Sequence, residues 1–233
     1  MGKTIKFIAQ DEHVWKVRPR PYPAIKNLPK WWKEIPAYSN YQQKFDLNPG
    51  PTVTVKRCVP TLDMFGAGYY VPLWSDLLVK QDNGFPLIKW NTQTEVVETW
   101  DKDQVSFFKI LDGYSKTVFK NIHGWTIKTP PGWSSMFMHP VAYPDLPFQV
   151  ISGIVDTDVF SGDINVPFVI KDKFEGIIEK GTPMFQIVPF KRESWTSEFS
   201  VKEPNEHFLD HEKLYSTMHR AYNFIIKHDK KYR

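Results

Sequence analysis

The residues in this sequence most able to do chemistry are its histidines and one short run of carboxylates. The histidines are His13, His123, His139, His207, His211, His219 and His228. A non-haem iron site needs two histidines and one carboxylate that converge and leave coordination positions open. No histidine here has an acidic residue two positions later, so the nearest substitute combines His123 or His139 with Asp156 or Asp158. These four residues are the candidates for a cupin-like enzyme that uses a divalent metal, and turn capping by the two aspartates is the favoured interpretation.

His207 and His211 have the i, i+4 spacing of a zinc pair on a helix. A zinc-protease helix has glutamate directly after its first histidine, whereas Phe208 stands there in this chain. Because the general base is missing, a solvent-facing pair of histidines is the favoured interpretation. We predict no metal and no other cofactor.

Nucleophilic catalysis has little support in the sequence. Cys58 lies in a strand-like pattern with no base beside it, which favours a buried, inert thiol. There is no Gly-x-Ser-x-Gly elbow, and Gly66-Ala67-Gly68 lacks the third glycine of a phosphate-binding loop. The catalytic residues are therefore unknown, and a non-enzymatic protein is favoured.

Aromatic and cationic residues alternate near the N-terminus: Trp15, Arg18, Arg20, Tyr22, Lys30, Trp31, Trp32 and Lys33. Such residues stack on bases or sugar rings and contact phosphates, but a tryptophan pair between prolines also anchors an extended arm to its own sheet. The favoured interpretation is this structural anchor, followed by contact with a protein or a glycan, with nucleic acid last. The candidate binding residues are Trp31, Trp32, Arg18, Arg20 and Lys30.

The composition indicates an all-β protein. The 233 residues include 36 aromatics, nine of them tryptophan, and 19 prolines against 12 glycines. Bulky aromatics favour sheets, and frequent prolines interrupt helices. Residues 1–33 carry a local charge of +6 within an overall net charge of +4, so the basic character belongs to the N-terminal segment.

Other features of the sequence bear on its location. A single cysteine excludes an intramolecular disulfide, no apolar stretch is long enough to span a bilayer, and the first residues lack a secretory signal. We therefore expect no membrane association and a reducing, cytosolic site of synthesis.

Alternating and β-rich segments, separated by turn residues, predict ten or more short strands. The expected strands are Thr4–Ala9, Thr52–Cys58, Gly68–Leu73, Asp76–Lys80, Pro86–Trp90, Glu95–Trp100, Trp125–Lys128, Ser134–His139, Phe148–Val155, Val166–Ile170, Gly176–Ile178 and Met184–Phe190. We expect Pro86–Trp90 to pair with Glu95–Trp100, and one or two helical turns within Leu28–Pro36. This pattern predicts a jelly-roll-like β-sandwich.

The sandwich is expected to occupy residues 1–200 as one domain, with residues 1–50 as an extended, proline-rich arm packed on it. The expected core residues are Phe137, Phe148, Ile154, Phe168, Ile178, Phe185 and Ile187. Thr129–Gly132 and Lys180–Pro183 are expected at sheet ends, with Gly132 and Gly181 at positive φ.

Residues 201–233 contain a predicted amphipathic helix, from Glu206 to Lys230. Its apolar stripe comprises Phe208, Tyr215, Met218, Tyr222 and Ile225. About two dozen helical residues span roughly 36 Å, which exceeds a typical strand length of about 17–20 Å. We therefore expect part of the stripe to overhang one sandwich and to form the interface of a homo-oligomer, or a contact with another protein.

Seven segments are distinctive as a set. They are Leu28–Lys33, Arg57–Pro60 with Asp63, Gly68–Asp76, Trp125–Ser134, His139–Pro140, Gly153–Asp158 and Gly181–Glu193. Over roughly residues 25–195 the set resembles a protein family of tailed phages, especially T4-like marine ones, and of some bacteria. The resemblance implies a phage or phage-derived origin and carries no catalytic residues, because the family has no established activity. With the cytosolic features above, it implies a location in the cytoplasm of the host cell, with association with a virion as a further option, and other phage or host proteins as partners besides a second copy of the chain. Gly181–Phe190 also resembles a strand of trimeric dUTPases, whose catalytic motifs are absent here.

The sequence thus predicts a phage-related accessory or structural protein that acts through its surfaces. A cupin-like metalloenzyme and a carbohydrate-binding module are the alternatives.

Overall fold

The computed structural model describes residues 3–39, 52–201, 228 and 230–232. The chain forms two compact units. The first contains residues 1–29, 65–192 and 232–233, and the second contains residues 30–64 and 193–231. Most of the helix expected over Glu206–Lys230, its whole apolar stripe and the His207–His211 pair lie outside the described residues; His228 and Lys230, which are described, are not helical.

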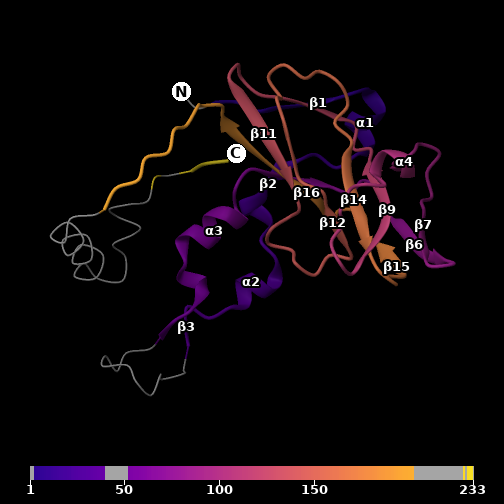
Figure 1. Ribbon diagram of the computed structural model, residues 1–233, viewed down its shortest axis with the longest axis horizontal. Coiled ribbons are helices and arrows are strands. Elements are labelled where there is room, and N and C mark those ends of the chain that lie inside the picture. Colours follow the sequence, from indigo (N-terminus) through magenta and orange to yellow (C-terminus); the bar gives the residue numbers. More distant parts are fainter. Residues whose placement is uncertain (1–2, 40–51, 202–227, 229, 233) are drawn as a thin grey trace. The chain divides into compact units, whose positions relative to one another are not determined.

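The first unit is built mostly of antiparallel strands (Figure 1). Its five-stranded sheet has the order β13 (Gly153–Val155), β11 (Trp133–Met138), β16 (Pro183–Lys191), β5 (Tyr69–Pro72) and β2 (Tyr22–Pro23). Its four-stranded sheet has the order β12 (Phe148–Val150), β14 (Val166–Lys171), β9 (Tyr114–Asn121) and β8 (Val97–Thr99). A β-sandwich-like, all-β fold is therefore confirmed at this level.

Two smaller sheets complete the first unit. The three-stranded sheet has the order β15 (Gly176–Ile178), β6 (Leu77–Asp82) and β7 (Phe85–Lys89), and β1 (Lys6–Ala9) pairs with β10 (Trp125–Lys128). The described part of this unit also has three short helices: α1 (Glu12–Val17), η1 (Ala24–Asn27) and α4 (Lys102–Val105). Asp11 begins α1, because its carboxylate accepts a hydrogen bond from the Val14 amide at 2.7 Å.

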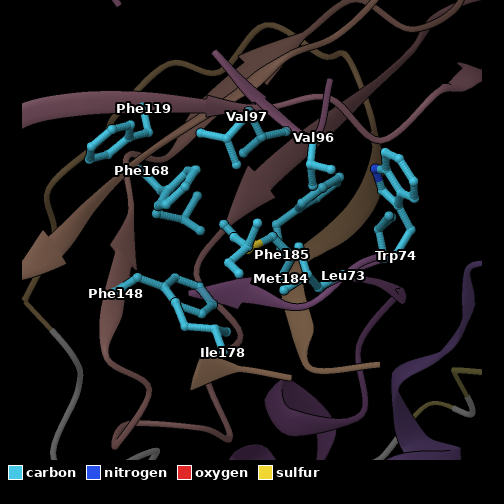
Figure 2. Packing of buried hydrophobic residues seen from close by; sticks show 14 of the residues in the cluster. Leu73, Trp74, Val96, Val97, Phe119, Phe148, Phe168, Ile178, Met184 and Phe185 are labelled. Atoms are coloured by element: carbon cyan, nitrogen blue, oxygen red, sulfur yellow. The ribbon is translucent and has the colours of Figure 1, made fainter. Parts of the chain in front are cut away.

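The core of the first unit joins side chains from several sheets. Phe168 on β14 lies next to Phe119 on β9 and Phe148 on β12, with ring centroids 5.7 Å and 6.0 Å away. Figure 2 shows these rings in one cluster with Met184 and Phe185 of β16. Six of the seven expected core residues are buried; the exception is Ile154, which is 61% exposed on the edge strand β13.

The second unit contains α2 (Lys30–Glu34), β3 (Tyr38–Ser39), β4 (Thr52–Val53), η2 (Val55–Arg57) and α3 (Val59–Phe65, whose last residue belongs to the first unit). The α2 helix confirms the expected helical turns within Leu28–Pro36. The strand expected over Thr52–Cys58 is wrong beyond Val53. The Thr54 hydroxyl accepts from the Lys56 amide at 3.2 Å and begins a 3-10 turn, so the β-branched pattern does not continue as a strand.

The expected pairing of Pro86–Trp90 with Glu95–Trp100 is also wrong. β7 pairs with β6 across Asn83-Gly84, while β8 pairs with β9. Asn83 and Gly84 both have positive φ, at 50° and 82°. A two-residue turn of this kind matches the twist of a tight hairpin, so the nearest upstream strand is the favoured partner.

The single strand expected over Phe148–Val155 is divided into two. β12 belongs to the four-stranded sheet and β13 to the five-stranded sheet, so the chain changes sheets at Ile151-Ser152. By contrast, the two expected turns are confirmed: Gly132 precedes β11 with φ 81°, and Gly181 precedes β16 with φ 92°. Only glycine takes this backbone conformation without steric cost.

Among the described residues, no helix combines the length and the apolar character required to cross a membrane.

Candidate functional site

His123 lies between β9 and β10 and is buried. The main-chain N–H of Trp125 donates to its Nδ1 at 3.1 Å, so Nδ1 carries no proton and Nε2 donates to the Ile164 carbonyl at 2.6 Å. Burial lowers the pKa of His123 to about 4. The imidazole is therefore neutral near pH 7, with both nitrogens bonded to main chain.

His139 repeats this arrangement at the end of β11. Its Nδ1 accepts from the Val150 amide at 3.5 Å, and its Nε2 donates to the Tyr143 carbonyl at 3.2 Å. Burial lowers its pKa as well. Neither candidate metal-binding histidine therefore presents an unengaged ring nitrogen, which a neutral imidazole needs for coordination.

Asp156 and Asp158 follow β13 and meet the end of β16. The Arg192 guanidinium holds Asp158 with two bonds, Nη1–Oδ1 at 2.7 Å and Nη2–Oδ2 at 2.5 Å, and lies 3.2 Å from Asp156. Hydrogen bonds from Arg192 lower the pKa of Asp158 to about 2. The Gly132 amide also donates to Asp158 at 2.8 Å, and the Ser134 hydroxyl donates to Asp156 at 2.6 Å.

These bonds give the two aspartates a clear structural role: they join the β13 end to the β10–β11 turn and to Arg192 after β16. A buried hydroxyl chain reinforces the junction, because Thr157 Oγ1 lies 2.7 Å from Thr129 Oγ1 and 2.9 Å from Ser135 Oγ. Within the described parts of the chain, no three His, Cys, Asp or Glu side chains form a metal-binding group.

Arg18, a predicted binding residue, is buried instead. Its guanidinium carbon lies 4.0 Å from the centroid of the Trp74 ring, and Nη1 donates to the Ile122 carbonyl at 3.0 Å. A Cβ on Gly124 would lie 2.6 Å from Nη1, so glycine leaves the room that Arg18 occupies. Burial lowers the pKa of Arg18, and its role here is packing.

The other predicted binding residues are divided between the two units. In the first unit, Arg20 stacks on Trp15 at 4.1 Å. In the second, Trp32 is buried with the Lys56 ammonium 5.0 Å from its ring, while Trp31 is partly exposed. Lys30 pairs with Glu34 one helical turn away, at 3.5 Å.

Cys58 is exposed, so the expectation of a buried thiol is wrong. It stands at the start of α3, where the Thr61 hydroxyl donates to its sulfur at 3.1 Å and lowers the pKa of the thiol. The residue is exposed because Thr52–Cys58 ends in a 3-10 turn rather than in a sheet.

A pocket of about 320 Å³, which sequence reasoning missed, lies at one edge of the sandwich. The five-stranded sheet contributes Phe137, Gly153 and Val155, and the four-stranded sheet contributes Val166 and Pro167. The remaining lining residues are Trp100, Gln104, Val105, Phe108, Ile151, Ser152, Ile164 and Asn165. The pocket is thus bounded by both sheets, by the β12–β13 connection and by α4 with its flanking residues.

The pocket reaches the core. Phe137, Ile164 and Val166 belong to the buried apolar cluster, whereas Gln104, Ser152 and Phe108 are exposed at the surface. His123 fixes one wall, since its ring donates to the Ile164 carbonyl. No single motif marks this site, because its residues come from four separate stretches of sequence, 100–108, 137, 151–155 and 164–167, and are mostly apolar.

Searches of known protein-family models and of curated protein sequences find no match to this chain.

Proposed function

We propose that this protein is a non-enzymatic accessory or interaction protein of a tailed phage, made in the cytoplasm of the host cell. A jelly-roll connectivity, a packed N-terminal arm and a homo-oligomeric state belong to the same proposal. Its phage origin rests on the resemblance of the seven distinctive segments.

The observation that carries the proposal is the state of the two histidines. His123 and His139 each bond main-chain groups through both ring nitrogens. Metal coordination would require breaking at least one of these bonds, in a buried setting at His123 and a half-buried one at His139, which leaves a main-chain group unsatisfied. Asp158 is likewise held in two charge-assisted hydrogen bonds by Arg192.

Metal analysis of the purified full-length protein tests this function. We expect iron, zinc and manganese well below one equivalent per chain, and no change in metal content on substitution of His139→Ala or Asp156→Asn. A stoichiometric metal that is lost in either variant would overturn the argument from the two histidines and favour the cupin-like metalloenzyme instead. Thermal melting with and without a chelator provides a second readout, and we expect the two melting curves to coincide.

A further inference from the structure

We propose that the pocket between the two sheets and α4 is a binding site for a small, uncharged, largely apolar ligand with one hydrogen-bonding end. This inference stands apart from the proposed function, because it rests on the pocket and on Gly153 rather than on the histidines.

The size of the pocket sets the size of the ligand. About 320 Å³ is the liquid volume of about ten water molecules, at roughly 30 Å³ each. Pockets that hold small molecules begin near 300 Å³ and are mainly apolar. The ligand therefore has roughly ten non-hydrogen atoms, the size of one or two fused rings.

The lining determines the polarity of the ligand. The described residues that form the wall include no charged side chain, so a charged group entering the pocket would lose hydration without gaining a counter-ion. Gln104, Ser152 and Asn165 supply amide and hydroxyl groups, which both donate and accept hydrogen bonds. These three side chains suit a hydroxyl, carbonyl or N–H group on an otherwise apolar molecule.

Gly153 supplies an independent observation. A glycine within a strand lowers stability unless the backbone needs positive φ or space is needed. Gly153 is not among the glycines with positive φ, and a Cβ added to it would meet no atom within 4 Å. Gly153 is exposed and lines the pocket on the same face of β13 as Val155, so its missing side chain leaves open space at the mouth of the pocket.

A neighbouring cavity provides a comparison for the preference of the pocket for uncharged ligands. It has a volume of about 750 Å³, shares Val105 and Phe108, and is lined by charged residues that include Lys102, Lys109 and Asp172. The two cavities differ in the charge of their walls, so an uncharged probe and a charged probe of matched shape should separate them.

Methyl NMR of the full-length protein tests the inference, with 2-naphthol as the uncharged probe and 2-naphthoate as its charged counterpart. For about eleven non-hydrogen atoms we expect a Kd on the order of 0.1–1 mM for 2-naphthol. The shifted methyl groups should be those of Val155, Ile164 and Val166. We expect 2-naphthoate to bind at least about tenfold more weakly.

The matched variants place a phenylalanine ring on opposite faces of β13. Gly153→Phe fills the pocket and should weaken 2-naphthol binding at least about tenfold. Ile154→Phe adds its ring on the exposed face and should leave the affinity unchanged. If Gly153→Phe does not melt cooperatively, Gly153→Leu repeats the test with a smaller side chain.

Four results would overturn the inference. They are the absence of 2-naphthol binding at millimolar concentration, equal binding of 2-naphthoate, shifts confined to Ile110 and Leu111 of the charged cavity, and wild-type affinity in the filled variant. The metal analysis remains informative in each case, so failure of the ligand site and failure of the proposed function are distinguishable.

Discussion

Two kinds of region in the first unit differ in how their side chains are used. The polar junctions, around His123, around His139 and around Asp158, are filled with hydrogen bonds, whereas the pocket at the edge of the sandwich keeps open space. At the junctions, His123, His139 and Asp158 have their hydrogen-bonding capacity engaged by main chain or by Arg192. At the pocket, apolar walls from both sheets leave space, and Gly153 enlarges it. Reactive residue types therefore hold this fold together, while unreactive ones form the place where a ligand fits.

The largest effect we expect separates the core from the edge strand. Phe168→Ala removes a ring that packs between Phe119 and Phe148, and it should lower the free energy of unfolding by about 3–5 kcal/mol. Ile154→Ala, on the exposed face of β13, should change it by less than about 0.5 kcal/mol. Urea unfolding of both variants measures the difference, and equal losses would contradict the assignment of Ile154 to the surface.

The next effect depends on pH. His123 has a pKa of about 4 when folded and about 6.5 when unfolded. Between these values the unfolded chain binds more protons, so the free energy of unfolding falls as pH decreases from 6.5 to 4, by about 3 kcal/mol for this residue. Above pH 6.5 the residue contributes no further change. His139 adds a fall in the same direction because burial lowers its pKa too.

Asp158 extends this dependence to lower pH. Its pKa is about 2 when folded and about 3.9 when unfolded, so the stability it provides is present above pH 3.9 and is lost as pH falls towards 2. Equilibrium unfolding across pH 2–8 measures the change in stability over both pH ranges. His123→Gln should remove the change between pH 4 and 6.5, and Asp158→Asn should remove the change between pH 2 and 3.9. A flat curve between pH 4 and 6.5 in the wild-type protein would contradict the neutral, doubly bonded state of His123.

The alternation of apolar and polar residues, together with the glycines and prolines typical of turns, was enough to predict many strands of the sandwich. Trp125–Lys128 and Gly176–Ile178 are strands with the expected bounds, and Gly132 and Gly181 have the expected positive φ. The change of sheet within Phe148–Val155 was not predictable, because apolar residues follow one another on both sides of Ile151-Ser152. Strand propensity describes each segment, but not the sheet that the segment joins.

The position of Arg18 shows why the candidate site was harder to predict. An arginine between prolines and aromatics is predicted to be exposed. In the structure, Trp74, Ile122 and Gly124, which are distant in sequence, surround Arg18 and bury it. The pocket likewise forms from distant parts of the chain. Apolar residues from four segments line it, and none of these segments contains a binding motif. Long-range pairing determines both, and local sequence does not reveal it.

An effect of intermediate size on the free energy of unfolding tests the polar junction around Thr157. Thr157→Val keeps the shape of a fully buried side chain but removes the hydroxyl shared by Thr129 and Ser135. Leaving these two buried hydroxyls with fewer partners should lower the free energy of unfolding by about 1–3 kcal/mol. Binding of 2-naphthol at the pocket should remain unchanged. An unchanged free energy of unfolding would contradict the stabilising role of the Thr157 hydroxyl.

The smallest expected effect compares two glycines whose surroundings are equally open. Gly132 and Gly153 each have no atom within 4 Å of the position of an added Cβ, so neither substitution causes a clash. They differ in backbone conformation, since Gly132 has φ 81° and Gly153 lies outside the positive-φ region. Gly132→Ala should lower the free energy of unfolding by about 1–2 kcal/mol, the cost of a side chain in the left-handed region.

Gly153→Ala should instead raise the free energy of unfolding by about 0.5–1 kcal/mol, because alanine restricts the unfolded chain and fits the strand. It should also weaken 2-naphthol binding slightly, since one methyl group enters the pocket. Urea unfolding of the two variants gives opposite signs under this account. If both alanines destabilise the protein equally, Gly153 serves the backbone rather than the pocket, and the argument that its missing side chain makes room for a ligand is wrong.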